Sequence, residues 1–182
     1  GLANLFGIGG SSLMSRSLGM NNHQKAKQAA SFSIWTAIAV SLIYGIALFK
    51  VRSMILPIVG ANEETYDFCC QYIFWTITIG AMPTVLNQEL AHLVRAEGHS
   101  AQASFGVALG GVLNIILDPI FIFPLGLEVA GAAIATMISN VAAALYFILL
   151  LVRKRNTTDI SFNPKRYTWR ERIPREVLLV GF

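Results

Sequence analysis

Asp118 carries a carboxyl group within a long apolar stretch, and together with the residues around it this group could bind a cation. Asn114 lies four residues earlier, so an α-helix would place both side chains on one face. Pro119 cannot donate a backbone hydrogen bond to the carbonyl of Ile115, and it tends to kink the helix there. The Asp118 carboxyl, the Asn114 amide and the freed carbonyl of Ile115 would then lie close together. Such a group of oxygens suits a proton or a hard cation such as Na⁺.

The free-energy cost of placing Asp118 in a membrane favours a functional role. An aspartate at the centre of a lipid-facing helix costs roughly 2.5–3.5 kcal/mol on insertion scales. A residue with that cost is usually retained where it faces a polar cavity and acts there. The alternatives are a structural hydrogen bond across the helix bundle and a position near the outer interface of the membrane.

Two polar residues of the next apolar stretch, Thr136 and Asn140, could extend this site. Asp118 lies seven residues before Leu125, and Thr136 lies seven residues after Val129, on either side of a short turn. At a rise of about 1.5 Å per residue, both lie roughly 10 Å from that turn. Thr136 is therefore a candidate ligand of the same cation, and Asn140 is a candidate for a substrate path. A packing role for both stays open.

Asn87, Gln88 and Glu89 follow one another near the end of another apolar stretch, with His92 three residues further on. This place in the stretch favours a position of Glu89 and His92 at the membrane interface, where long side chains extend their polar ends toward the headgroups. The alternative is a role of Asn87, Gln88 and Glu89 in the path of a transported substrate. Pro83 predicts a kink in the helix that carries them.

The sequence lacks the residue patterns of an enzyme or of a tightly bound metal. Cys69 and Cys70 are adjacent, so neither a disulfide framework nor the spacing of zinc ligands can be built from them. An intramembrane enzyme would need a second catalytic group at the depth of Asp118, and the sequence offers neither a deep His nor an Asp there. We therefore expect a protein that is not an enzyme, with no cofactor and no firmly held metal apart from a coupling H⁺ or Na⁺.

The composition of the chain indicates a membrane protein. Of its 182 residues, 54% are hydrophobic and 13% are charged, and the mean hydropathy is +0.57. Soluble domains have roughly 25% charged residues. Long runs without charge predict four membrane-spanning helices, since about 20 apolar residues cross the hydrocarbon layer as a helix. The predicted spans are residues 29–49, 68–93, 101–123 and 129–152.

The two ends of the chain resemble parts of further spans. Residues 1–18 are apolar and rich in small residues, which is typical of the second half of a span, and residues 177–182 resemble the beginning of another. Residues 1–152 would then form most of one helical lobe, and residues 153–176 would form a linker. The predicted fold class is an all-α integral membrane protein, a bundle of transmembrane helices within a longer transporter-like protein.

The basic residues predict the orientation of these helices. With alternating spans, twelve of the fourteen Lys and Arg residues fall on one side. An excess of Lys and Arg is typical of cytoplasmic loops, so that side is expected to face the cytoplasm. The loops at residues 19–27, 95–100 and 153–175 are therefore predicted to be cytoplasmic, in a multi-pass protein of the plasma membrane.

The basic linker also carries two aromatic residues, Tyr167 and Trp169, and this composition could indicate nucleic-acid binding. We favour an amphipathic linker that lies against anionic lipid headgroups, with its aromatic residues at the interface. The expected partners are the lipid bilayer and small organic molecules, with no nucleic acid. We expect the full-length protein to be monomeric.

Three stretches together resemble the multidrug and toxic compound extrusion (MATE) family. Residues 11–19 (SSLMSRSLG) are similar to its second helix and the cytoplasmic exit of that helix. Residues 93–98 (LVRAEG) are similar to the loop before its fifth helix. Residues 114–123 (NIILDPIFIF), followed by 131–136 (GAAIAT), are the most specific match. The resemblance covers the whole chain, which would be helices two to six and the start of helix seven.

The resemblance implies a fold and a function. Members of the family have two six-helix lobes that alternate between inward- and outward-open forms and exchange H⁺ or Na⁺ for organic cations. This chain would form most of the amino-terminal lobe. Asn114 and Asp118 match the cation-site pair of that lobe, and Thr136 matches a neighbour. The expected function is a secondary antiporter that exports organic, often cationic, drugs or toxic compounds in exchange for H⁺ or Na⁺.

Two other functions remain as alternatives. A lipid-linked saccharide flippase of the same superfamily would require a basic central cavity. No Lys or Arg lies deep within a complete predicted span, which disfavours anionic lipid substrates. An intramembrane enzyme is disfavoured by the missing second catalytic group.

The orientation can be tested by labelling single cysteines in the full-length protein. Cysteines at Glu63 and Glu128 should react with a membrane-impermeant reagent from outside intact cells, because both positions are predicted to be extracellular. Cysteines at Lys25 and Arg170 should react only after permeabilisation. The opposite pattern would contradict the orientation.

Overall fold

The computed structural model describes the chain except residues 1, 59, 61, 64, 169–172 and 182. Trp169 and Arg170 therefore lie outside the described residues. The described part is all-helical and contains no strand. Its helices are α1 (Leu2–Gly19), α2 (His23–Ile58), α3 (Tyr66–Ile73), the π-helical segment η1 (Phe74–Ile79), α4 (Ala81–Ala96), α5 (Ser100–Ile122), α6 (Glu128–Arg153), the 3₁₀ turn η2 (Pro164–Arg166) and α7 (Ile173–Gly181).

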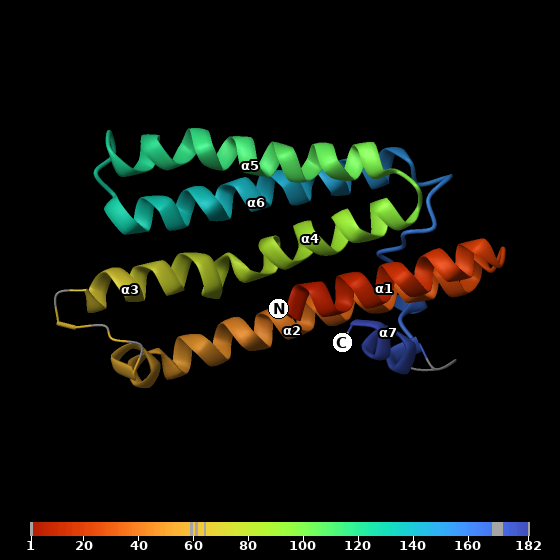
Figure 1. Cartoon of the computed structure of the whole chain (residues 1–182), viewed down its shortest axis with the longest axis horizontal. Helices are drawn as coiled ribbons and strands as arrows, with labels where there is room; N and C mark the ends of the chain where they lie inside the picture. The colour runs from red at the N-terminus through yellow and green to blue at the C-terminus, as the bar shows by residue number, and fades with distance from the viewer. Residues whose placement is uncertain (1, 59, 61, 64, 169–172, 182) are drawn as a thin grey trace.

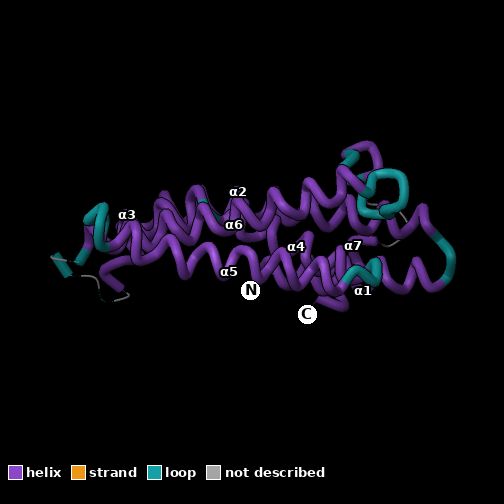
Figure 2. Tube along the Cα trace, turned by 90° about the horizontal axis from the view of Figure 1, so that it is seen from above, coloured by secondary structure: helices purple, strands orange, loops and turns teal. Residues whose placement is uncertain are grey.

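The long helices run side by side, so that the connecting loops gather at the two ends of an elongated bundle (Figures 1 and 2). Helices α2, α5 and α6 are each long and apolar enough to cross a membrane. The segment from α3 through η1 to α4 forms a fourth crossing if its two parts are one span. Which residues lie within the bilayer stays a prediction. Because α2 has 36 residues, it is about 54 Å long and extends beyond a hydrocarbon layer of about 30 Å.

The fourth segment is bent, as Pro83 predicts. The axes of its two parts, Tyr66–Ile79 and Ala81–Ala96, differ by 46°. The bend lies at Gly80, whose backbone N–H donates to the carbonyl of Trp75 at 2.9 Å, one residue further back than in an α-helix. Pro83 has no N–H to donate to the carbonyl of Ile79, so the regular hydrogen-bond pattern breaks there.

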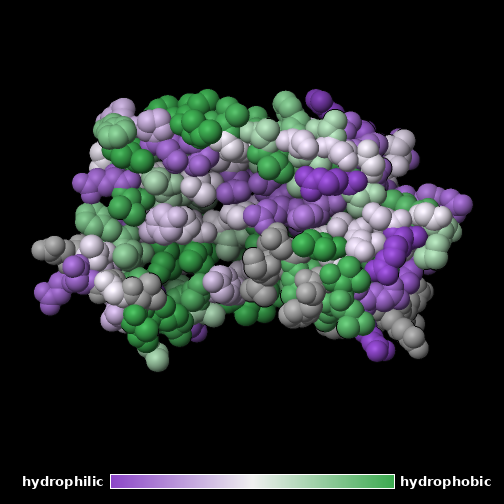
Figure 3. All heavy atoms as spheres, viewed as in Figure 1, coloured by the Kyte–Doolittle hydropathy of each residue, from purple (hydrophilic) through white to green (hydrophobic). Residues whose placement is uncertain are grey.

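Helix α5 has small residues on its inner face and large apolar residues on its outer face. Its buried residues are Ala103, Gly106 and Gly110. A Cβ atom at Gly106 would lie 2.4 Å from the ring of Phe147 on α6, so the glycine allows the two helices to pack closely. The large residues of α5 point outward and contribute to the hydrophobic surface over this helix in Figure 3. A face of this kind suits contact with lipid.

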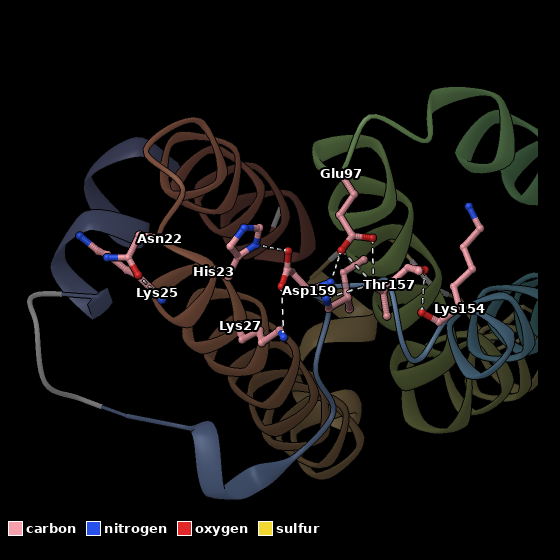
Figure 4. A network of polar contacts seen from close by, with 10 residues as sticks. Asn22, His23, Lys25, Lys27, Glu97, Lys154, Thr157 and Asp159 are labelled. Carbon is pink, nitrogen blue, oxygen red and sulfur yellow. Dashed lines mark hydrogen bonds and ion pairs between the residues drawn. The ribbon is translucent and has the colours of Figure 1, made fainter.

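Asp159 in the linker after α6 forms ion pairs with the helix bundle (Figure 4). The Asp159 carboxylate pairs with His23 Nδ1 at 2.8 Å and with Lys27 Nζ at 3.3 Å, both near the start of α2. The Asp159 backbone N–H and the Thr158 hydroxyl both donate to the Glu97 carboxylate at the end of α4. The linker therefore joins the start of α2 to the end of α4.

Tyr167 of the linker stacks on Phe32 of α2, with ring centroids 5.4 Å apart. The position of the linker against lipid headgroups stays a prediction. The last helix, α7, begins at Ile173, so the linker expected at residues 153–176 includes the start of this helix. Lys25 on α2 pairs with Glu176 of α7 at 3.1 Å, so the neighbouring exposed residue Gln24 is the better position for cysteine labelling.

Candidate functional site

Helices α5 and α6 bring together the three residues predicted to bind the coupling cation. The Asn114 side-chain amide on α5 donates to the Asp118 carboxylate at 3.0 Å and to the Thr136 hydroxyl of α6 at 3.3 Å. All three side chains are half-buried. Asn114 thus bridges a carboxylate on its own helix and a hydroxyl on the next.

The hydrogen bonds continue from this group to α4. The Asn140 amide donates to the Thr136 backbone carbonyl at 3.0 Å, and the Asn87 amide donates to the Asn140 side-chain oxygen at 3.0 Å. We call these five residues, Asp118, Asn114, Thr136, Asn140 and Asn87, the polar chain. It connects α5, α6 and α4 through the interior of the bundle.

The short turn between α5 and α6 sets the register of the polar chain. Gly126 has a φ of +61°, a left-handed conformation that glycine adopts without strain. After the turn, Gly131 lies directly against the backbone of Phe121, where a Cβ atom would be only 2.9 Å from the Phe121 carbonyl. Helices α5 and α6 therefore approach closely between the turn and the site. This contact places Thr136 opposite Asn114.

The polar chain contains the ligand types that a monovalent cation needs. Asp118 supplies one carboxylate, Thr136 a hydroxyl, and Asn114 an amide oxygen once its side chain turns over. A single carboxylate balances a single positive charge, so the group suits H⁺ or Na⁺ better than a divalent ion. The Asn114 amide donates to the Asp118 and Thr136 oxygens, which are the oxygens that a bound cation would contact.

Gln88 and Glu89 lie on different sides of α4. Gln88 is exposed and lines a cavity of about 470 Å³ with residues of α2 and η1. Glu89 is 0% exposed, so the expectation that it reaches the membrane interface is wrong. Gly7 and Gly10 of α1 have no side chains, and the Glu89 carboxyl of α4 lies against them in the space that this leaves. The three-residue spacing of these glycines is the sequence signal that could have indicated this.

Comparison with known proteins identifies the family. A family model described as MatE matches residues 2–120 of the chain. The chain belongs to the MATE family.

Similar MATE proteins include multidrug export proteins MepA. The MepA of Staphylococcus aureus strain NCTC 8325 is 37% identical over 181 residues, and that of Staphylococcus saprophyticus is 37% identical over 182 residues. Each match covers 100% of this chain and 40% of the relative. The chain therefore spans less than half the length of these MATE relatives.

Solved structures of MATE transporters have the same fold. A structure of a multidrug resistance MATE transporter in its inward-facing conformation matches with a TM-score of 0.91 at 30% identity. The outward-facing conformation also matches with a TM-score of 0.91 at 30% identity. Each match covers 99% of this chain and 40% of the other. The corresponding part of those structures thus has a similar shape in both conformations.

The bond between Asn87 and Asn140 can be measured in a double-mutant cycle on the full-length protein. Replacing either residue by alanine leaves the other without its partner in the interior, which should cost about 1–3 kcal/mol of stability. The double variant should cost less than the sum, by a coupling energy of about 0.6 kcal/mol, the average for polar pairs between membrane helices. Thermal unfolding of the four proteins in detergent gives this value.

The control pair is Asn87→Ala with Thr157→Ala, because Thr157 lies in the linker and shares no partner with Asn87. The costs of this pair should add. Additive costs for Asn87→Ala and Asn140→Ala as well would contradict the interhelical bond.

Proposed function

We propose that the full-length protein is a secondary antiporter that exports organic, often cationic, compounds in exchange for H⁺ or Na⁺. The polar chain supports this proposal most strongly. It places a carboxylate and a hydroxyl each within hydrogen-bond distance of the same amide inside an apolar bundle. An ionisable group at such a position is costly and is retained mainly where it binds an ion.

The cavity beside Gln88 supports an organic substrate. Its walls are largely apolar, with the polar groups of Ser41, Tyr44, Thr76, Thr84 and Gln88 among them. Within the described residues, its lining includes no Lys or Arg. An apolar wall with a few hydroxyl and amide groups suits an organic molecule, whereas an anionic lipid-linked sugar would require positive charge. The relatives named multidrug export proteins agree with this substrate class.

The proposal predicts that Asp118→Asn abolishes ion-driven efflux by the full-length protein. Asparagine keeps the shape of the side chain and can still accept a hydrogen bond from Asn114, but it can neither ionise nor balance the charge of a cation. Efflux of a fluorescent organic cation, driven by an imposed H⁺ or Na⁺ gradient, should therefore fall to the level of vesicles without the protein. Asn114→Ala should reduce efflux less, because it removes one ligand and leaves the carboxylate.

The matched control is Glu63→Gln, which removes an exposed carboxylate in the loop between α2 and α3. It should leave efflux unchanged. Efflux at the wild-type rate by a folded, membrane-inserted Asp118→Asn variant would show that Asp118 is structural.

A further inference from the structure

Glu89 is a second carboxyl group in the interior of the bundle, and the polar chain does not include it. The residue lies near the middle of α4 and is 0% exposed. Neither of its carboxyl oxygens has a hydrogen-bond partner among the described residues. This isolation needs a physical explanation, because polar groups in protein interiors are nearly always paired.

Two other helices close over the Glu89 carboxyl. A Cβ atom at Gly10 of α1 would lie 3.7 Å from Glu89 Oε1, and one at Gly7 would lie 3.4 Å from Oε2. Ser33 of α2 comes next to Gly10, but its hydroxyl donates to the Phe6 carbonyl at 2.9 Å. On this side the carboxyl therefore meets two glycines and a serine whose hydroxyl donates elsewhere.

No basic side chain forms an ion pair with Glu89 among the described residues. On α4, the titratable or charged side chains near Glu89 are His92 and, one turn later, Arg95. The helices packed against α4 are α1, α2, α5 and α6. Their titratable or charged side chains are Arg16 on α1; His23, Lys25, Lys27, Tyr44, Lys50 and Arg52 on α2; Asp118 on α5; and Glu128, Tyr146 and Arg153 on α6.

These surroundings accept a neutral carboxyl and exclude a carboxylate. An ionised group buried without a partner costs several kcal/mol even after the protein relaxes. A protonated carboxyl carries no net charge and is far easier to accommodate. With α1 packed on α4 as in this structure, the enclosure of Glu89 therefore favours its protonated form.

His92 provides a route for that proton. A Cβ atom at Gly7 would lie 2.7 Å from His92 Cδ2 and 3.4 Å from Glu89 Oε2, so the imidazole and the carboxyl meet at the same point of α1. His92 also lines an open groove of about 280 Å³ between α1 and α4, together with Ser11, Ser12, Ser15 and Arg95. An imidazole can accept a proton on one nitrogen and release one from the other near neutral pH.

We propose that Glu89 and His92 form a second proton-binding site of this lobe, in which Glu89 stores the proton and His92 exchanges it with water in the serine-lined groove. The site lies at a different depth in the bundle from Asp118. Both depths can be counted from the short loop between α4 and α5. At about 1.5 Å per residue, Glu89 lies roughly 12 Å along α4 from Glu97, and Asp118 lies roughly 27 Å along α5 from Ser100. The proposal concerns proton binding and stands independently of the proposed antiport.

Infrared spectroscopy of the full-length protein in lipid tests the stored proton without any transport assay. The difference between wild type and Glu89→Gln should contain the carbonyl stretch of one protonated carboxyl. The matched variant Glu63→Gln should lose the bands of an ionised carboxylate. Carboxylate bands in the Glu89→Gln difference near neutral pH would overturn the proposal.

Thermal stability gives a second, independent measurement with another variant. If Glu89 is neutral and unpaired, Glu89→Leu removes only an unsatisfied group, so the thermal midpoint should stay the same or rise. A large fall of the midpoint would mean that the carboxyl has a partner in the full-length protein, which contradicts the proposal.

The role of His92 is tested by transferring the protein to D₂O and following the shift of the Glu89 band. His92→Phe keeps a ring at this position but cannot carry a proton, so exchange should become at least tenfold slower. Ser12→Ala, in the same groove, should change the exchange rate less than twofold. Equal rates in wild type and His92→Phe would exclude the proposed route.

Discussion

The bridge from the Asn114 amide to Asp118 and Thr136 is the interaction on which the rest of the site depends. It joins a carboxylate on α5 to a hydroxyl on α6 by hydrogen bonds of 3.0 and 3.3 Å. Lipid offers no water to replace these bonds, so each polar group must find its partner within the bundle. Because Thr136 also accepts from Asn140 through its carbonyl, the bridge fixes where the hydrogen bonds to α4 begin. A cation that entered between Asp118 and Thr136 would turn the Asn114 amide and disturb this order.

The two carboxyl groups of the interior are arranged in contrasting ways. Asp118 is half-buried and accepts a hydrogen bond from the Asn114 amide. Glu89 is fully enclosed and lacks such a donor in the described structure, which suits the neutral form. Solved MATE structures in the inward- and outward-facing conformations match this chain equally well, with a TM-score of 0.91 each. A lobe that keeps its shape would carry both groups as one body. In the proposed antiporter, alternating access would then come from the movement of this lobe against the second one.

The sequence predicts features that depend on neighbouring residues and misses those that depend on distant ones. Charge-free runs indicate α5 and α6, and the four-residue spacing of Asn114 and Asp118 places them on one face. The burial of Glu89 depends on α1 packing over α4, which no pattern within α4 itself reveals. The link between Glu97 and Asp159 joins residues 62 positions apart, so it was missed for the same reason. The cation-binding role of Asp118, Asn114 and Thr136 stays a prediction, because hydrogen bonds alone do not identify an ion.

The most direct measurement of the central claim is the number of coupling ions that the purified full-length protein binds at equilibrium. Na⁺ binding at constant pH and proton binding at constant Na⁺ can both be counted per protein, for wild type and for Asp118→Asn, with Glu89 intact in each. If the polar chain binds the coupling cation, Asp118→Asn binds one ion fewer than wild type, either one Na⁺ or one H⁺. Identical counts of both ions in the two proteins would contradict the account.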